Sequence, residues 1–391
     1  MMIDRVSLLV VAVASAAGCT DGLPRPDAST AAASARSLAA RPPVLTPQQS
    51  GTTNRLQAIS PVSARVAWAS GVGGTYAVTT DGGKTWRAAV VPGAEALQFR
   101  DVEGVSDQIA YLMAAGVGTD SRIYKTTNGG ATWSLQFENQ DPNGFYDCFA
   151  FWTAQRGITM ADSVDGRFPV IRTGNGKDWI DIGDRLPPAQ AGEAAFAASG
   201  TCAATQGDRR AWLVTGGAER ARVLATTDRG DSWASYDTPI IQGTPSSGGF
   251  SVAFRDRHHG ILGGGELAAP AALSNNVARS RDGGRTWQLA APTPFPGAIF
   301  GLSYAQGHGE RDRGDDADDD RVGDAARRDD DRDGDRAAVV ATGPGGAAWS
   351  ADEGTSWSPL DGVLNYWAVA FANDRVGWLV GTDGRILKIE L

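Results

Sequence analysis

Acidic residues recur at a fixed place in this sequence, inside an octapeptide that occurs several times. The first copy, TTDGGKTW at 79–86, places Asp81 between two threonines and ahead of a tryptophan. Near-copies follow, reading TTNGGATW at 126–133, TTDRGDSW at 226–233, SRDGGRTW at 280–287 and SADEGTSW at 350–357. Carboxylates can ligate metals or move protons, but each copy offers a single acid or amide, which is too few for a metal site. We therefore interpret the octapeptide as a turn.

The octapeptide contains the residue types that a tight hairpin needs. The carboxylate of Asp81 can accept hydrogen bonds from N–H groups of its own turn. Gly83 can adopt a backbone conformation closed to residues with a β-carbon, and Trp86 can pack its ring between sheets. The same structural roles fall to Asn128, Gly130 and Trp133, to Asp228, Gly230 and Trp233, to Asp282, Gly284 and Trp287, and to Asp352, Gly354 and Trp357.

Other residues offer little support for catalysis. His258, His259 and His308 lack a metal-ligand spacing, and no nucleophile elbow, P-loop or dinucleotide fingerprint occurs in a strand–helix context. The segment DDDRDG at 329–334 matches the start of a calcium loop, but Val340 stands where that loop needs a bidentate glutamate. We expect neither a metal nor a cofactor.

Asp101 and Asp147 are the candidate pair for glycoside hydrolysis, which needs two carboxylates that face each other. The alternative is that they cap strands or pair with an arginine such as Arg100, and this is the interpretation we favour.

The N-terminus indicates export. Arg5 precedes SLLVVAVASAAG, an apolar run too short to span a bilayer and typical of a secretory signal. The following Ala16-Ala17-Gly18-Cys19 resembles a bacterial lipobox, which implies that residues 1–18 are a lipoprotein signal peptide and that Cys19 carries lipid. An ordinary signal peptide that leaves Cys19 unmodified is the alternative. Residues 19–50, rich in Pro, Ala, Ser and Thr, then predict a flexible tether.

Cys148 and Cys202 are the remaining cysteines. In an exported protein they predict a disulfide, with two buried free thiols as the alternative. Both lie on expected first strands of consecutive repeat units.

The repeats define the elements that position these residues. The octapeptides end at Trp86, Trp133, Trp233, Trp287 and Trp357, and a degenerate copy, RTGNGKDW, ends at Trp179. In that copy Gly174 replaces the acid, so we expect a looser turn with Gly176 and Trp179 retained. The spacings are 47, 46, 54, 54 and 70 residues. A period near 50 with strand-like content predicts a β-propeller.

Each unit contains four strand-like runs, but the last unit ends at Leu391 with only three. Residues just before Leu56 must then supply the fourth strand, which removes the exposed sheet edges. We expect an all-β, seven-bladed propeller of four-stranded antiparallel blades over residues 51–391, closed by pairing of N- and C-terminal strands. The longest spacing contains residues 309–336, with 13 acidic residues and 7 arginines, which predict a disordered loop.

Composition agrees with this fold class. The 391 residues include 50 glycines and 12 tryptophans, a profile that suits short strands and tight turns. The net charge of −9 argues against a nucleic-acid partner.

The octapeptide is similar to the Asp-box, or BNR repeat, of sialidases, sortilin-type receptors and several glycoside hydrolases. A sialidase-type activity would also need an arginine-isoleucine-proline motif ahead of the first box, and the nearest string is Arg167-Phe168-Pro169 in mid-chain. The whole repeat region resembles the photosystem II stability/assembly factor-like propellers. That resemblance implies an exported propeller that assists the assembly of membrane complexes.

We therefore expect a non-catalytic scaffold, anchored by its N-terminal lipid and facing the periplasm or the cell exterior. It would bind a protein partner of the cell envelope as a monomer. A glycan-active hydrolase with channel carboxylates is the alternative, with a glycan as its ligand. The expected ligand face is formed by the starts of the first strands and the loops between second and third strands. Its candidate residues are Arg100, Asp101, Tyr146, Asp147, Arg167, Tyr366 and Trp367.

Overall fold

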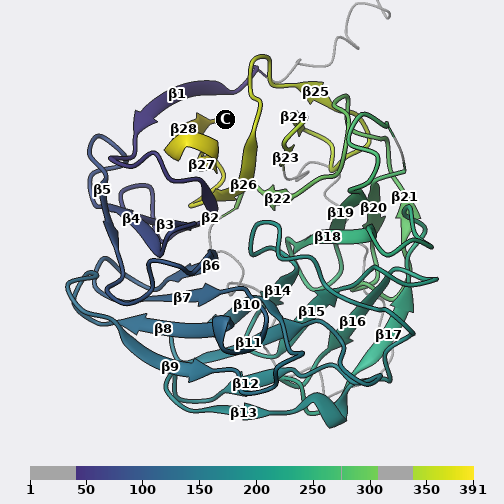
Figure 1. Ribbon diagram of the computed structural model, residues 1–391. Coiled ribbons are helices and arrows are strands. Elements are labelled where there is room, and N and C mark those ends of the chain that lie inside the picture. The colour runs from purple at the N-terminus through teal and green to yellow at the C-terminus, as the bar shows by residue number, and fades with distance from the viewer. Residues whose placement is uncertain (1–40, 274, 307–337) are drawn as a thin grey trace, which may run out of the picture. The chain divides into compact units, whose positions relative to one another are not determined.

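Seven four-stranded antiparallel sheets are arranged around a central axis in the computed structural model (Figure 1). The structure describes residues 41–273, 275–306 and 338–391, and the propeller is the unit Pro42–Leu391. The predicted signal peptide, Cys19 and the Asp/Arg-rich insertion 309–336 lie outside the described residues. The prediction of a seven-bladed, four-stranded propeller is confirmed.

The strands follow the chain blade by blade, from the axis outward. Blade 1 comprises β2 (Leu56–Pro61), β3 (Ala67–Gly71), β4 (Thr75–Thr79) and β5 (Arg87–Val90). Blade 2 comprises β6 (Phe99–Gly104), β7 (Ala110–Ala114), β8 (Arg122–Thr126) and β9 (Ser134–Glu138). Blade 3 comprises β10 (Tyr146–Thr153), β11 (Arg156–Ala161), β12 (Ile171–Thr173) and β13 (Trp179–Asp181). Blade 4 comprises β14 (Ala203–Gln206), β15 (Arg210–Val214), β16 (Arg222–Thr226) and β17 (Ala234–Asp237). Blade 5 comprises β18 (Ser247–Phe254), β19 (Gly260–Glu266), β20 (Val277–Ser280) and β21 (Gln288–Leu289). Blade 6 comprises β22 (Gly301–Tyr304), β23 (Val339–Gly343), β24 (Gly346–Ser350) and β25 (Ser358–Pro359), and blade 7 comprises β26 (Tyr366–Phe371), β27 (Val376–Gly381), β28 (Arg385–Glu390) and β1 (Val44–Gln49).

The ring closes through β1, which pairs antiparallel with β28 from Val44 opposite Glu390 to Gln49 opposite Arg385. This closure confirms the predicted pairing of N- and C-terminal strands. It also corrects the boundary of the tether, because Val44–Gln49 is a strand of blade 7 and lies inside the predicted tether 19–50. The hydrophobic pattern did not predict this strand, because β1 is an outer strand and is largely exposed. Its sequence is mostly polar, with TPQQ following Val44-Leu45.

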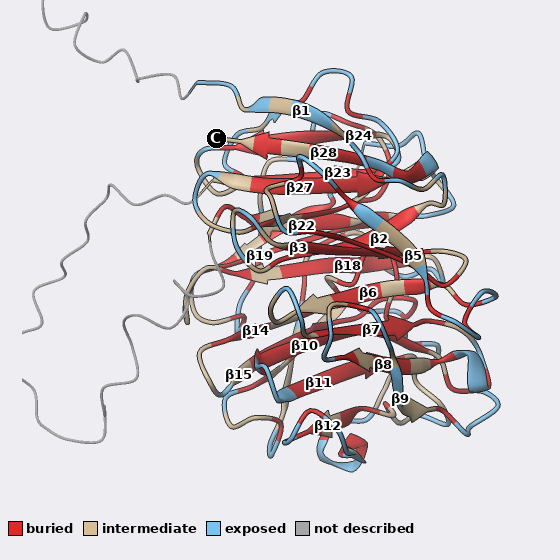
Figure 2. Ribbon diagram, turned by 90° about the vertical axis from the view of Figure 1, so that its left-hand side faces the viewer, coloured by how far each residue is buried: buried red, intermediate tan, exposed pale blue. Residues whose placement is uncertain are grey.

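The two faces of the ring differ in the turns they carry. We call the face where the inner strands start the mouth face; it also carries the loops between second and third strands and three short 3₁₀ turns, Gly118–Asp120, Gly183–Arg185 and Thr382–Gly384. The opposite face carries the octapeptide hairpins, and we call it the box face. The C-terminus marks the box face in the side view of Figure 2, where the buried residues run along the strands. No described helix has the length and apolar character needed to cross a bilayer.

Each octapeptide forms a hairpin turn between the third and fourth strands of its blade. In the first copy the hydroxyl of Thr79 accepts the N–H of Gly83 (2.9 Å), and the Asp81 carboxylate accepts the N–H of Thr85 (2.9 Å) and its hydroxyl (2.7 Å). These bonds join residues four apart, so the octapeptide alone can make them. The hydrogen bonds from Thr85 lower the pKa of Asp81 to about 2.

The degenerate third copy differs from our expectation. Asn175, not position 174, takes the place of the acid: its Oδ1 accepts the N–H groups of Lys177 (3.0 Å) and Asp178 (2.9 Å). The hydroxyl of Thr173 accepts the N–H of Gly176 at 3.0 Å. The prediction of a looser turn was wrong. Thr173 and Gly176 are three positions apart, whereas the corresponding hydroxyl and glycine residues of the first copy, Thr79 and Gly83, are four apart. The polar residue of this shorter turn is therefore Asn175.

The octapeptide hairpins also join neighbouring blades. Each of the six receives at least one side-chain donor from the preceding blade, counting blade 7 before blade 1. The donor–acceptor pairs are Gln48 Nε2 to Gly82 O (3.4 Å), Arg87 to Gly129 O, Lys125 Nζ to Gly176 O (2.9 Å), Arg172 Nη1 to Arg229 O (2.6 Å), Trp212 Nε1 to Gly283 O (2.8 Å) and Arg279 Nη1 to Thr355 Oγ1 (2.7 Å). Turn carbonyls in five hairpins and a turn hydroxyl in the sixth thus fix one blade against the next at six of the seven junctions.

Candidate functional site

A β-bulge stands near the start of the inner strand in five of the seven blades. The pairing with the second strand skips one residue at Gln57, Arg100, Asp147, Phe250 and Trp367. Bulges turn a side chain away from the regular alternation of a strand and are frequent beside functional sites. Arg100, Asp147 and Trp367 of the predicted ligand face therefore occupy equivalent places around the channel.

Blade 4 departs from this pattern and covers the channel at the mouth face. Its inner strand starts only at Ala203, and the preceding segment Glu193–Cys202, which we call the strap, makes contacts on blades 2, 3, 5 and 6. The sequence AAFAASGTCAA at 194–204 was expected to be a first strand. Its small residues and Gly200 allow a close approach instead: a β-carbon on Gly200 would lie 2.2 Å from Oδ1 of Asp101.

Acidic side chains of blade 3 lie against the first half of the strap. Asp162 Oδ1 accepts the N–H of Ala195 (3.0 Å), and the N–H of Ala197 lies near the Asp147 carboxyl and lowers its pKa, against the effect of burial. Arg100 on β6 donates to the carbonyl of Ala197 at 3.2 Å. The backbone of the strap is thereby bound on both its donor and its acceptor side.

The second half of the strap is fixed on the opposite side of the channel. Ser199 Oγ donates to Phe300 O (2.5 Å), and Thr201 Oγ1 donates to Ser251 Oγ (2.8 Å). Phe196 stacks on Phe250 with ring centroids 4.1 Å apart. The strap therefore reaches across the opening and does not run along one edge of it.

A disulfide fixes the end of the strap. Cys202 is bonded to Cys148 on β10, with the two Cα atoms 6.1 Å apart. The bridge joins blades 3 and 4, the pairing proposed from the sequence. Cys202 itself lies one residue before β14 and not on the first strand, where the sequence analysis placed it.

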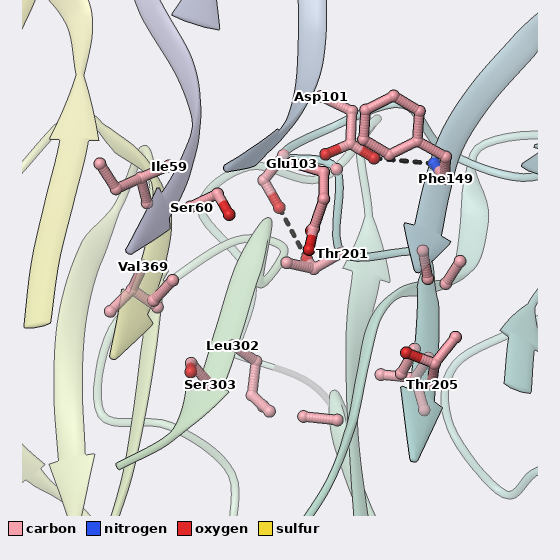
Figure 3. A pocket seen from close by; sticks show the side chains of 18 of the residues that line it. Ile59, Ser60, Asp101, Glu103, Phe149, Thr201, Thr205, Leu302, Ser303 and Val369 are labelled. Atoms are coloured by element: carbon pink, nitrogen blue, oxygen red, sulfur yellow. Dashed lines mark hydrogen bonds between the residues drawn. The ribbon is translucent and has the colours of Figure 1, made fainter. Parts of the chain in front are cut away.

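The cavity beneath the strap is small. Its volume is about 120 Å³, and it is lined by residues of several inner strands, including Asp101, Phe149, Thr201, Thr205 and Leu302 (Figure 3). Pockets for drug-sized ligands usually measure about 300–1,000 Å³, so this space suits a few water molecules.

The acids of this cavity are not arranged as a glycosidase pair. Asp101 and Glu103 both line it, but they are two residues apart on β6 and so project from the same strand to the same side. Asp101 also accepts the N–H groups of Val102 (2.7 Å) and Phe149 (2.8 Å). These bonds tie it to the backbone of blades 2 and 3, as in the strand-capping alternative.

Burial sets the protonation of the acids near the strap. It raises the pKa of Asp101 well above its usual value, against the two N–H bonds that the carboxylate accepts. Burial also raises the pKa of Asp147 strongly, with a further rise from nearby Asp162, and raises the pKa of Asp162 to about 6. Asp147 and Asp162 lie close enough to titrate as a pair, and their mutual repulsion favours a state in which one of them holds a proton.

An aromatic series leads from the strap to an arginine that the sequence analysis missed. Phe250 is 6.0 Å from Phe300, Phe300 is 4.9 Å from Trp367, and the guanidinium of Arg55 lies 4.4 Å from the Trp367 ring. Burial lowers the pKa of Arg55 and of Arg100. The signal that could have found Arg55 is its place immediately before an inner strand, equivalent to Asn365 and Gln98 in other blades.

Three predicted ligand-face residues lie away from the channel opening or inside the fold. Tyr146 is buried and packs against Phe137 at 5.1 Å. Arg167 forms ion pairs with Asp181 (2.7 Å) and Asp184 (2.5 Å) on blade 3. Tyr366 is largely buried and lines a shallow cavity of about 740 Å³ between blade 7 and residues 47–54.

Buried polar atoms without partners remain around the opening. They are Oε1 and Nε2 of Gln57, Oδ2 of Asp147 and Nε of Arg55. Such atoms are rare in folded proteins and are usually satisfied by water or ligand. No group of three or more His, Cys, Asp or Glu side chains within the described ranges is placed to hold a metal ion.

Comparison with known proteins shows the fold only. No protein-family model matches the chain, and no curated protein does. Among solved structures, YCF48 from Cyanidioschyzon merolae matches with a TM-score of 0.58 at 15% identity over 88% of this chain and 98% of that chain. A streptogramin B lyase matches with 0.58 at 11% over 89% and 98%, and U3-55K with 0.54 at 10% over 89% and 98%. At these identities one fold includes an enzyme and proteins not named as enzymes, so function must be argued from the site.

Proposed function

We propose that this protein is an exported, lipid-anchored scaffold that binds a protein partner of the cell envelope on its mouth face and catalyses no reaction. The single observation that carries the proposal is the strap. It closes the channel on the face where propellers of this kind present their inner-strand starts, and it leaves a cavity of about 120 Å³ below it. What remains accessible on that face is a broad surface with half-buried side chains such as Arg55, Arg100 and Trp367.

Protein partners use such surfaces. Aromatic and arginine side chains are enriched where proteins bind each other, because they combine large apolar area with hydrogen-bonding groups. Arg55 and Trp367 already form a cation–π pair at the rim of the opening. The sequence resemblance to assembly factor-like propellers and the Asp-box character of the octapeptides support the same assignment.

The hydrolase alternative receives no support from the geometry. Of the candidate pair, Asp101 lines the channel cavity and accepts the N–H groups of Val102 and Phe149, whereas Asp147 is not among the residues that line it. The other acid of the cavity, Glu103, is on the same strand as Asp101. Glycosidase carboxyl groups are separated by about 5–9.5 Å with the sugar between them.

Export and anchoring are part of the proposal and rest on the N-terminal sequence. Cys19 follows a secretory apolar run, and residues 20–43 then join it to β1. Mass spectrometry of the N-terminal peptide tests the anchor: diacylglyceryl-modified Cys19 is expected, and an unmodified Cys19 or an uncleaved leader overturns it. A Cys19→Ser variant should leave the membrane fraction.

Photo-crosslinking in intact cells tests the binding face. The full chain carries p-benzoylphenylalanine in place of Thr53, exposed on the mouth face, or in place of Ala131, exposed in the second octapeptide on the box face. We expect one protein species to be crosslinked from Thr53 and not from Ala131. Equal crosslinking from both positions, or none from Thr53, overturns the proposed face.

A further inference from the structure

A run of seven apolar residues, six of them exposed, lies on the mouth face of blade 5. The segment Leu267–Leu273, with the sequence LAAPAAL, joins β19 to β20, and every residue in it is exposed except the half-buried Ala269. Leu267 is 43% exposed and Leu273 is 64% exposed. Soluble proteins rarely keep such a run in water unless it contacts something.

The segment is held in place by its base. The Glu266 carboxylate accepts the N–H of Ala268 (2.9 Å) and the hydroxyls of Thr244 (2.5 Å) and Ser246. The N–H of Leu267 donates to Ser246 O at 3.0 Å. These bonds fix the backbone while leaving the leucines exposed, so the arrangement does not serve the core.

The neighbouring connection extends the same surface. The N–H of Gly297 donates to Ala272 O at 2.9 Å, which brings residues 292–297 against the segment. Pro292 and Pro294 are exposed there, and Pro296 is half-buried. No charged residue occurs in 267–278 or in 288–307, although the chain is 21% charged. We call Leu267–Leu273 together with Pro292–Pro296 the apolar shelf.

Charge and chain direction decide which occupant the apolar shelf fits. The insertion 309–336 carries 13 acids and 7 arginines, which an uncharged surface does not neutralise. The N-terminal segment carries two aspartates and two arginines between residues 20 and 40, and it enters the propeller at Val44, the end of β1 that lies on the box face. The apolar shelf itself lies on the mouth face, away from that entry point, and it lacks the Lys and Arg that an anionic bilayer attracts.

We propose that the apolar shelf is the docking surface for an uncharged, apolar segment of the protein partner. The inference rests on the proposed function, since it needs a protein partner on the mouth face. Burial of the two leucines would contribute most of the binding free energy of this contact, because the free energy gained grows with the apolar area removed from water.

The test uses the full chain with p-benzoylphenylalanine in place of Thr53. It measures whether substitutions in the apolar shelf lower the yield of the species crosslinked from Thr53. The variant is Leu267→Ser with Leu273→Ser. The control is Leu135→Ser with Ile180→Ser, two aliphatic residues of similar exposure, 48% and 55%, on outer strands of blades 2 and 3. We expect the shelf variant to lower the yield of the crosslinked species at least tenfold and the control to leave it within twofold, with both variants melting within a few degrees of the parent.

A second crosslinker in place of Ala271 identifies the occupant. The proposal expects the same protein species from Ala271 as from Thr53. Crosslinking to phospholipid or to a second copy of this chain from Ala271 overturns it, as does an unchanged Thr53 yield in the shelf variant. In those cases the Thr53 species still supports the proposed function, whereas loss of any protein species from Thr53 in the parent chain overturns the function itself.

Discussion

The octapeptide turn depends on hydrogen-bonding shape more than on charge. Asn128 stands where four of the other copies have aspartate, and its Oδ1 accepts the N–H of Thr132 (2.9 Å) while its Nδ2 donates to the Thr132 hydroxyl (2.8 Å). Asp352 accepts the N–H (2.8 Å) and the hydroxyl (2.7 Å) of Ser356. Only the direction of the hydroxyl bond differs between the two.

This equivalence predicts the effect of changing Asp352. Asp352→Asn should lower the free energy of unfolding by less than about 0.5 kcal/mol, because the amide can copy Asn128. Asp352→Ala should lower it by about 1–2 kcal/mol, because the N–H and hydroxyl of Ser356 lose their partner. Urea unfolding measures both, and equal losses for the two variants would contradict the account.

The Asp147–Asp162 pair predicts a pH dependence of stability. Burial raises the pKa of Asp162 to about 6, above the value of about 4 in an unfolded chain. The folded state therefore binds more protons between pH 4 and 6, and the free energy of unfolding falls as pH rises through that window, on the order of 1–3 kcal/mol in total.

Asp162→Asn should reduce this fall, and the part that remains should come from Asp101 and Asp147, whose pKa values burial also raises. Urea midpoints at pH 4.5 and 7.5 measure it, and Asp165→Asn, an exposed neighbour, is the control. The octapeptide acids act in the opposite sense but at lower pH, since the pKa of Asp81 is about 2, and their contribution is lost only as pH falls from about 4 towards 2. A slope in Asp162→Asn as steep as that of the wild-type protein would show that Asp162 does not contribute to it.

At the scale of elements, the octapeptide hairpins connect blades as well as turning the chain. Arg172 on β12 donates to Arg229 O (2.6 Å) and pairs with Asp231 (2.9 Å) in the turn of the next blade. Arg172→Ala should cost about 1–2 kcal/mol in thermal or urea unfolding. Arg375→Ala, whose side chain is 79% exposed, should stay within about 0.5 kcal/mol. Similar losses for both would mean that the inter-blade bonds contribute nothing specific.

The strap is the element whose anchoring can be tested by its disulfide. Replacing Cys148 and Cys202 together by alanine should lower the free energy of unfolding by about 2–4 kcal/mol. It should also speed hydrogen exchange at the amides of Ala195, Ala197 and Ala198 relative to the octapeptide turns. The unreduced, denatured wild-type protein should show no free thiol at either position. Two titratable thiols would remove the bridge from the account.

Local contacts explain what the sequence could predict at this scale. The octapeptide turns were predictable because their bonds join residues two to four apart, so the repeat itself displays them. The strap was not predictable, because its conformation depends on Asp162, Arg100 and Phe300, which are distant in sequence. The same reason applies to Arg55 and Asp162, whose importance appears only when the inner strands meet around the axis.

At the scale of the whole molecule, closure depends on one short strand. Gln48 Oε1 accepts the indole N–H groups of Trp86 (2.9 Å) in blade 1 and Trp378 (3.0 Å) in blade 7. A chain that starts at Pro42 should melt within a few degrees of the mature protein, since the described unit begins there.

Removing β1 should have a much larger effect. A chain that starts at Asn54 lacks β1 and exposes the edge of β28, so we expect a large loss of stability and association through that edge. Calorimetry and sedimentation measure both. A fully stable, monomeric product would show that ring closure does not need β1.

The direction of the chain through β1 decides where the N-terminal segment joins the propeller. Because β1 runs from the box face to the mouth face, Val44 lies on the box face, opposite the proposed partner surface. That entry point could not be read from the sequence, because β1 was predicted to belong to the tether.

The central claim is that a protein partner binds the mouth face. The most direct measurement is the affinity between the purified propeller and the species crosslinked from Thr53, compared between two charge-inserting variants: Thr53→Glu on the mouth face and Ala131→Glu on the box face. The account predicts that Thr53→Glu weakens Kd at least tenfold while Ala131→Glu leaves it within twofold. Equal effects of the two variants, or a larger effect of Ala131→Glu, would contradict it.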